Sequence, residues 1–195
     1  MSRSAEVRRA TRETDVRVRV DLDGAGTSDV STGVGFLDHL LTLLARHSLI
    51  DLEIAATGDL ETGSHHTAED VGITLGQALA KALGDRAGIE RYGWAAVPMD
   101  ECLALAAIDL SGRPYAAVDV PLPDMVIGGL ETETLPELLR GLANHAGLTL
   151  HVRLLAPGGA HHAMEGSVKA VAKALAIAVA PNPRVAGIPS TKGTI

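Results

Sequence analysis

Two kinds of hydrophobic spacing alternate along the first half of the chain. The stretch VRVRVDL at 16–22 alternates apolar and charged side chains, which predicts a strand with one buried face. Beyond it, apolar spacing and turn residues predict a helix, a strand, a polar loop and a second helix, at residues 36–47, 49–56, 57–64 and 65–83. Gly84 ends the second helix.

The second half repeats this order of elements. Strands are predicted within 94–109 and at 115–120, with SGRP at 111–114 as a turn between them. A helix, a strand, a loop and a helix follow at 134–146, 148–155, 157–160 and 161–180. Pro181 ends the last helix. Because strands and helices lack a regular βαβ rhythm, the pattern predicts α+β layers.

The two halves also match residue by residue. LDHLLTLLARHSLIDLEI at 37–54 aligns with LPELLRGLANHAGLTLHV at 135–152, and HHTAE at 65–69 aligns with HHAME at 161–165 after a two-residue deletion. Leucine-rich helices often resemble one another by chance, but matching HHxxE blocks after similar segments favour duplication. We therefore expect a single domain over 1–195, with internal repeats at about 9–93 and 94–180 and a polar tail at 181–195.

Composition narrows the class of protein. The chain has 195 residues, 46% apolar but only 2% aromatic, so its core must be built from Ala, Val, Leu and Ile. Its net charge of −7 fits nucleic acid poorly, and no apolar run approaches the roughly 18–20 residues of a membrane span. The segment MSRSAEVRRATRETDV lacks the apolar stretch of a secretory signal, and the single Cys102 excludes an internal disulfide. A soluble cytoplasmic protein is expected, without nucleic acid or membrane as partner.

The HHxxE blocks carry the candidate chemistry. An α-helix advances about 100° per residue, so residues four apart share a face and can reach the same ion. Those pairs are His65 with Glu69 and His161 with Glu165. The second histidines, at 66 and 162, lie about a quarter turn away, which predicts two metal sites that each take ligands from both halves. Imidazole with carboxylate suits Mn, Zn, Fe or Ni.

Several motifs together resemble the imidazoleglycerol-phosphate dehydratase family of histidine biosynthesis. They span about Arg9 to Gly193 and read GVGFLDH (33–39), HHTAED (65–70), GIERYG (88–93), MDE (99–101), SGRPY (111–115), HHAME (161–165) and STKG (190–193). The resemblance implies an internally duplicated α+β fold, with helices sandwiched between two four-stranded mixed sheets, similar to the second domain of ribosomal protein S5. It also implies a homo-oligomer of twenty-four subunits with shared active sites.

The resemblance further implies two Mn²⁺ ions per active site. One would be bound by His39, His66, His161 and Glu165, and the other by His65, Glu69, His162 and Glu137. The family usually has histidine where this chain has Glu137, and the internal alignment pairs Glu137 with His39. A carboxylate can replace imidazole on manganese. The alternative is a weakened second site in a metal-binding assembly protein of the same family.

The substrate would be D-erythro-imidazoleglycerol phosphate, dehydrated to imidazole-acetol phosphate and water. Its phosphate would be bound by Arg91, Arg113, Lys169, Ser190, Thr191 and Lys192, since arginine and lysine match phosphate oxygens. Other substrate contacts would come from Glu13, His39, His47, His65, Glu69 and His161.

The resemblance also implies how the reaction runs. With the ring held as a metal-bound imidazolate, hydroxide leaves the ring-attached carbon, and the neighbouring C–H becomes acidic enough to lose its proton. The product enol then tautomerises to the ketone. The expected acid and base groups are Glu13 first, then His47, with Glu69 and Glu165.

Overall fold

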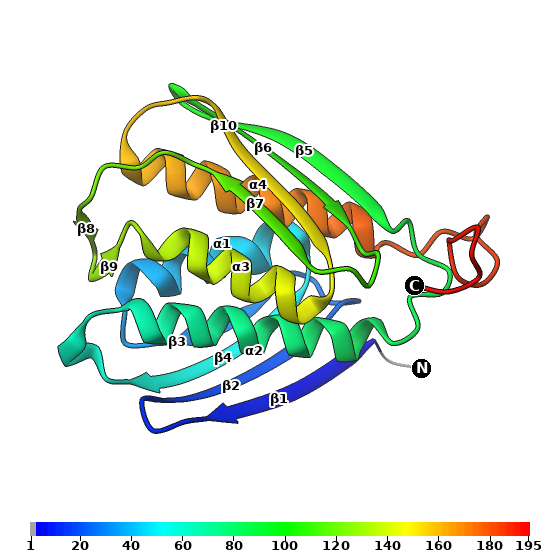
Figure 1. The fold of residues 1–195 in the computed structure, drawn as a ribbon, viewed down its shortest axis with the longest axis horizontal. Helices are drawn as coiled ribbons and strands as arrows, with labels where there is room; N and C mark the ends of the chain where they lie inside the picture. Colours follow the sequence, from blue (N-terminus) through cyan, green and yellow to red (C-terminus); the bar gives the residue numbers. More distant parts are fainter. Residues whose placement is uncertain (1–2) are drawn as a thin grey trace.

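The computed structural model describes residues 3–195 and has three layers, with four helices between two sheets (Figure 1). The helices are α1 (Gly35–Ser48), α2 (His65–Leu83), α3 (Thr134–Ala146) and α4 (Ala160–Val179). A short 3₁₀ turn, η1 (Leu60–Thr62), precedes α2. None of the helices within the described range is long and apolar enough to cross a membrane.

The two four-stranded sheets have the same topology. The first contains β1 (Ser4–Ala10), β2 (Thr14–Asp21), β4 (Asp51–Gly58) and β3 (Ser28–Ser31), in that spatial order. The second contains β5 (Tyr92–Met99), β6 (Cys102–Asp109), β10 (Thr149–Ala156) and β7 (Tyr115–Asp119). In both, the last strand is parallel to its neighbour and the other pairs are antiparallel. The expected α+β sandwich with mixed sheets is therefore confirmed.

The helices pack across the two halves. Helix α2 covers β1 and β2 and also contacts α3, whereas α4 covers β5 and β6 and also contacts α1. Glycine permits the close approach of α2 to α3, because a Cβ at Gly72 would lie only 2.3 Å from the carbonyl oxygen of Leu138. This cross-packing places residues of the first half beside residues of the second.

The core is aliphatic, as the composition predicts. It is formed mainly by Ala, Val, Leu and Ile, and Phe36 is the only buried aromatic residue within 3–195. The strand predicted at 16–22 buries Val16, Val18 and Val20 completely. Burying these three valines removes apolar surface from water on the inner face of the first sheet.

The sequence missed several strands. β1, β3 and a small hairpin of β8 (Val126–Ile127) with β9 (Leu130–Glu131) were not predicted. The stretch predicted as strand within 94–109 is a hairpin, β5 and β6, turning at residues 100–101. The strands that were not predicted, β1, β3, β8 and β9, are short or lie at sheet edges. There, pairing with a neighbour decides the structure more than local pattern does.

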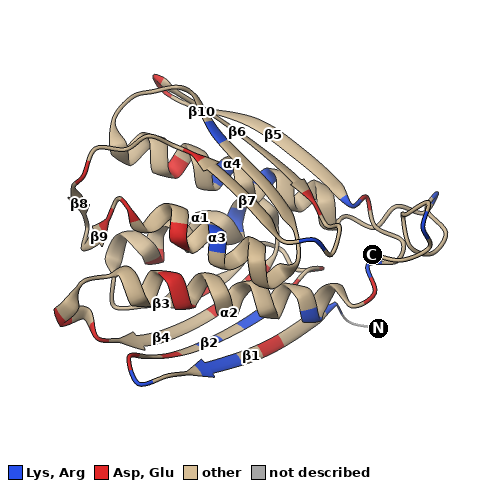
Figure 2. Ribbon diagram, viewed as in Figure 1, with Lys and Arg blue, Asp and Glu red and all other residues tan. Residues whose placement is uncertain are grey.

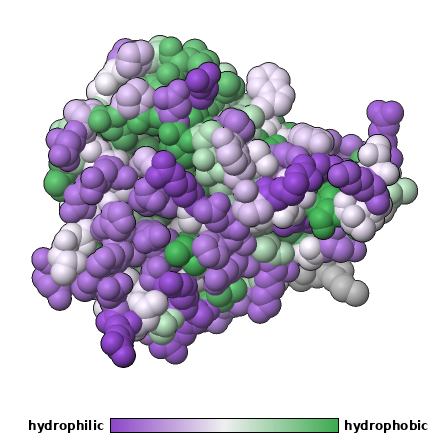
Figure 3. Space-filling model, in the orientation of Figure 1, coloured by the Kyte–Doolittle hydropathy of each residue, from purple (hydrophilic) through white to green (hydrophobic). Residues whose placement is uncertain are grey.

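The two sheets present different outer faces. On the first sheet, arginines are paired with acidic side chains, for example Arg17 with Glu6 and Arg8 with Asp15. Figure 2 shows basic and acidic residues mixed along β1 and β2. The second sheet instead exposes Trp94 (68%) and Leu155 (53%), and apolar residues gather in the upper part of Figure 3, over this sheet.

Candidate active site

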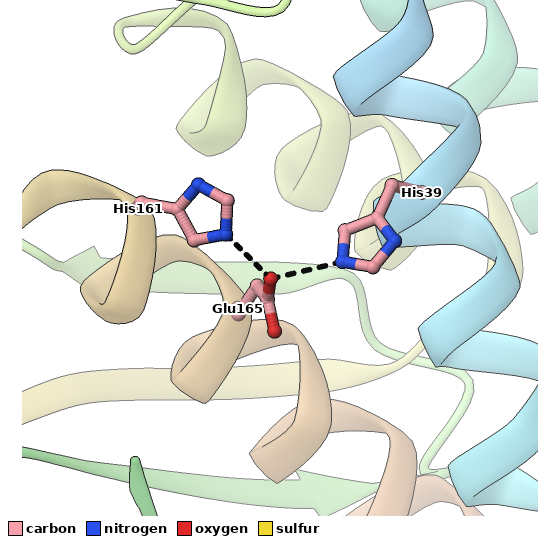
Figure 4. A group of neighbouring side chains, drawn as sticks. All are labelled: His39, His161 and Glu165. Atoms are coloured by element: carbon pink, nitrogen blue, oxygen red, sulfur yellow. Dashed lines mark hydrogen bonds and ion pairs between the residues drawn. The ribbon is translucent and has the colours of Figure 1, made fainter. Parts of the chain in front are cut away.

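Two histidines and a glutamate from opposite halves of the chain meet at one point (Figure 4). His39 comes from α1, and His161 and Glu165 come from the first turns of α4. The Nε2 atoms of His39 and His161 lie 2.9 and 2.7 Å from the same oxygen, Oε1 of Glu165. All three ligand atoms lie within 4.8 Å of one another. This donor set, two imidazoles and a carboxylate, suits a divalent transition metal.

Glu165 contacts both histidines of this group. Its side chain is 7% exposed, and its second oxygen accepts a hydrogen bond from Nζ of Lys169 at 2.8 Å. Burial by itself would raise the pKa of Glu165, but hydrogen bonds from Lys169, His39 and His161 outweigh it and lower this pKa to about 2. The carboxylate therefore stays ionised, as a metal ligand must.

Phe36 forms one wall of this site. Its ring lies 4.8 Å from that of His161 and 6.0 Å from that of His39, centroid to centroid. Phe36 is buried at the start of α1, one turn before His39. From the sequence, Phe36 was noted only as part of a motif, yet its ring packs against both imidazole rings.

The second histidine of each block pairs with a carboxylate outside this group. Nδ1 of His66 lies 3.0 Å from Asp59 Oδ2, and Nδ1 of His162 lies 3.0 Å from Glu101 Oε2. His66 was expected to join His39, His161 and Glu165; within this chain it lies on α2 and its Nδ1 pairs with Asp59, so its role as a ligand stays a prediction. The quarter-turn separation of adjacent helical residues explains why His162 does not join His161 at Glu165.

The other expected ligands do not assemble into a group of three within residues 3–195. His65 and Glu69 occupy the first two turns of α2, and Glu137 lies in the first turn of α3, where it forms an ion pair with Arg140. His162 instead forms a second potential metal-binding group with Asp100 and Glu101. The roles of His65, Glu69 and Glu137 as ligands stay predictions.

Most of the expected phosphate residues line one open pocket. The pocket is formed by Arg91, Tyr92, Arg113, Pro189, Ser190, Thr191 and Lys192. Arg113 is the more exposed of the two arginines, at 69% of its side chain, and its Nη2 lies 3.5 Å from Oδ2 of Asp109. Arg91 is buried and donates hydrogen bonds to Asp109 Oδ1 (2.7 Å) and to the carbonyl oxygen of Pro189 (2.7 Å), so it anchors the C-terminal loop. Lys169, expected with them, lies at Glu165 instead.

The histidine group and this pocket lie at opposite ends of α4. His161 is in its first turn, whereas the backbone N–H of Arg91 donates to the carbonyl oxygen of Ala178, at its other end. Seventeen residues of helix correspond to about 25 Å. In Figure 1, α4 runs from the β8–β9 side of the molecule to the side of the C-terminus. One small substrate cannot touch both regions of the same chain.

The first two of the expected proton-transfer residues, Glu13 and His47, lie in different places. Glu13 is exposed in the β1–β2 turn, and its carbonyl oxygen accepts a hydrogen bond from the N–H of Asp59 at 3.1 Å. His47 is in the last turn of α1. Burial lowers the pKa of His47, and the nearby charges of Lys173 and Lys169 lower it further.

Comparison with known proteins agrees with the motifs. A family model described as imidazoleglycerol-phosphate dehydratase (IGPD) matches residues 32–175. The chain belongs to the imidazoleglycerol-phosphate dehydratase family. The IGPD of Moorella thermoacetica is 56% identical over 195 residues, covering 100% of both chains. That of Methylibium petroleiphilum is 55% identical, covering 100% of this chain and 98% of the relative.

Solved IGPD structures have the same fold. The crystal structure of the Staphylococcus aureus IGPD has a TM-score of 0.83 and 37% sequence identity, covering 92% of this chain and 99% of that one. The structure of IGPD from Pyrococcus furiosus in complex with (S)-C348 has a TM-score of 0.84 and 38% identity, covering 97% and 100%. The family and the enzyme class expected from the sequence, a dehydratase of histidine biosynthesis, are confirmed.

Two carboxylates of this IGPD-family site were missed by sequence reasoning. Asp59 and Glu101 pair with His66 and His162 but belong to no HHxxE block. Glu101 lies in the MDE motif, but the motif by itself assigns it no role. Asp59 precedes His66 by seven residues in a polar loop, where a carboxylate is unremarkable, so local pattern gave no signal for it.

Proposed function

We propose that this chain dehydrates imidazoleglycerol phosphate to imidazole-acetol phosphate, with two Mn²⁺ ions per active site. The observation that carries the proposal is the meeting of His39, His161 and Glu165, whose donor atoms suit Mn²⁺. When bound, the metal would act as a Lewis acid toward the imidazole ring of the substrate and orient it.

The residues around the metal ligands have separate tasks. Lys169 holds one oxygen of Glu165 and leaves the other for the metal. Glu13, exposed and close to Asp59, is the proposed proton-transfer group, because loss of water requires a base for the C–H proton and an acid for the departing hydroxide. Arg113 and Lys192, with Ser190 and Thr191, would bind the phosphate.

We further propose that each active site is shared between subunits, in the assembly of twenty-four that the family resemblance implies. The separation of the histidine group and the phosphate pocket along α4 supports sharing, since a neighbouring chain would supply the missing half. The exposed apolar side chains of the second sheet, such as Trp94 and Leu155, also favour self-association.

We also propose that the protein works in the cytoplasm, since a reducing compartment suits the single free Cys102.

Turnover with and without metal tests the function. Protein stripped of metal and then supplied with Mn²⁺ should convert imidazoleglycerol phosphate to the ketone, whereas the stripped protein should not. Product formation is followed by ultraviolet absorbance of the enolised ketone, and bound manganese by elemental analysis. Manganese uptake without turnover would favour the weakened assembly protein over the enzyme, and no uptake would contradict the metal-dependent proposal.

Arg113 offers a test of the phosphate pocket. Its guanidinium is exposed, with only a long ion pair to Asp109, so it can also reach a bound phosphate. Arg113→Ala should therefore raise KM at least about tenfold, as expected when a charge-assisted hydrogen bond is lost, with a smaller effect on kcat. Steady-state kinetics measure both. Arg153→Ala is the matched control, because Arg153 is a similarly exposed arginine, paired with Asp119, outside this pocket. An unchanged KM for Arg113→Ala would remove this residue from the phosphate site.

A further inference from the structure

Two histidines of the HHxxE blocks are held by carboxylates in the same way. Nδ1 of His66 lies 3.2 and 3.0 Å from the two oxygens of Asp59, and Nδ1 of His162 lies 3.2 and 3.0 Å from those of Glu101. Asp59 comes from the loop between β4 and α2, and Glu101 from the turn between β5 and β6. The same contact is therefore made from two different places in the fold.

A hydrogen bond from Nδ1 to a carboxylate decides which ring nitrogen is free to bind a metal. An imidazole that donates its Nδ1–H to a carboxylate keeps its lone pair at Nε2, and the carboxylate fixes the orientation of the ring. Nε2 of His66 has no hydrogen-bond partner within residues 3–195. Both histidines are partly exposed, at 39% and 34% of their side chains, and Nε2 of His162 lies 4.0 Å from Oδ2 of Asp100.

Strand register identifies the counterpart of Glu101 in the first half. Asp21 pairs with Asp51 in the first sheet as Asp109 pairs with Thr149 in the second. Counting back along β2 and β6 from these positions makes Glu13 the counterpart of Glu101, each immediately before its strand.

The two halves therefore use carboxylates at non-equivalent positions for the same contact. In the second half the turn residue Glu101 itself pairs with the histidine. In the first half the loop is two residues longer, and its Asp59 pairs with His66. Within residues 3–195, the carboxylate of Glu13 makes no hydrogen bond or ion pair, although its charge is close enough to act on His66. Asp59 therefore pairs with Nδ1 of His66 as Glu101 pairs with Nδ1 of His162.

We infer that Asp59 and Glu101 are positioning residues that orient His66 and His162 toward metal, and that Asp59 leaves Glu13 free for proton transfer. This inference rests on the proposed metal-dependent function. It predicts that two structurally equivalent glutamates have different roles: Glu101 acts on metal binding, and Glu13 acts on the chemical step.

Manganese titration of the full-length metal-free protein tests the positioning roles. Asp59→Asn and Glu101→Gln keep the size of each side chain but remove its charge, and each should weaken Mn²⁺ binding by about 10- to 100-fold. The control is Glu61→Gln, an exposed carboxylate in the same loop as Asp59, which should leave the affinity unchanged. Thermal unfolding of each variant checks that the fold is retained.

Glu13→Gln completes the test. It should bind Mn²⁺ with the affinity of the wild type but lose most of its kcat, which a merely structural residue would not do. Equal manganese affinity of wild type, Asp59→Asn and Glu101→Gln would overturn the inference while leaving the proposed function intact. Weakened binding by Glu13→Gln would overturn the division of roles. A wild type that binds no Mn²⁺ would contradict the proposed function and the inference together.

Discussion

His161→Ala should remove one of the two Mn²⁺ ions expected per active site and lower kcat/KM by at least about a thousandfold, equivalent to roughly 4 kcal/mol of transition-state stabilisation. His161 and His39 share one oxygen of Glu165, so the substitution leaves this group with one imidazole. The side chain of His161 is 51% exposed, and its loss should therefore cost little folding stability.

Elemental analysis of the purified protein measures the metal, and steady-state kinetics with saturating Mn²⁺ measure the activity. His145→Ala is the matched control, because His145 is an exposed histidine on α3 whose Nδ1 bonds only the carbonyl oxygen of Gly141 in its own helix. It should retain both metal and activity. Wild-type manganese content in His161→Ala would exclude His161 from the metal site.

Two inactive variants should restore each other's activity when they assemble together. His161→Ala damages the metal group, and Arg113→Glu places a negative charge in the phosphate pocket at the far end of α4. If each active site takes these residues from two different chains, random mixing yields an intact pair in about one site in four. Each variant alone should have almost no activity, whereas the mixture should reach about a quarter of the wild-type rate.

The mixture is prepared by co-expression with two different tags and purified through both, so that only mixed assemblies are assayed. The control is the double variant His161→Ala/Arg113→Glu co-expressed with the wild type, in which an intact pair arises at the same frequency. Mixed assemblies of the two single variants that stay inactive, beside an active control, would show that both groups act within one chain. They would then contradict the shared site.

The local pattern of apolar residues was sufficient to predict the helices, but it predicted the edge strands of the sheets poorly. All four helices were predicted within a few residues, because each buries a continuous apolar face at helical spacing. β3 and β8 were missed because strands of four and two residues carry too little alternation to detect. β1 was missed because its pattern, SAEVRRA, acquires meaning only when it pairs with β2.

Part of the candidate site could likewise be predicted from local spacing, and part depends on tertiary packing. The repeated HHxxE blocks identified metal chemistry from spacing alone, since a helix fixes the relation between residues four apart. Spacing could not show that His39 joins His161 and Glu165, because that contact depends on the packing of α1 against α4. Nor could it show that Asp59 pairs with His66, since a loop conformation decides that contact.

The sequence by itself determined the family, the α+β duplication and the kinds of residue that do the chemistry, because these follow from motifs and periodicity along the chain. Only the tertiary structure decided which ligands meet within one chain and which face outward. The physical reason is that helix packing joins His39 to Glu165, while the length of α4 keeps His161 about 25 Å from the end of the helix beside the phosphate pocket.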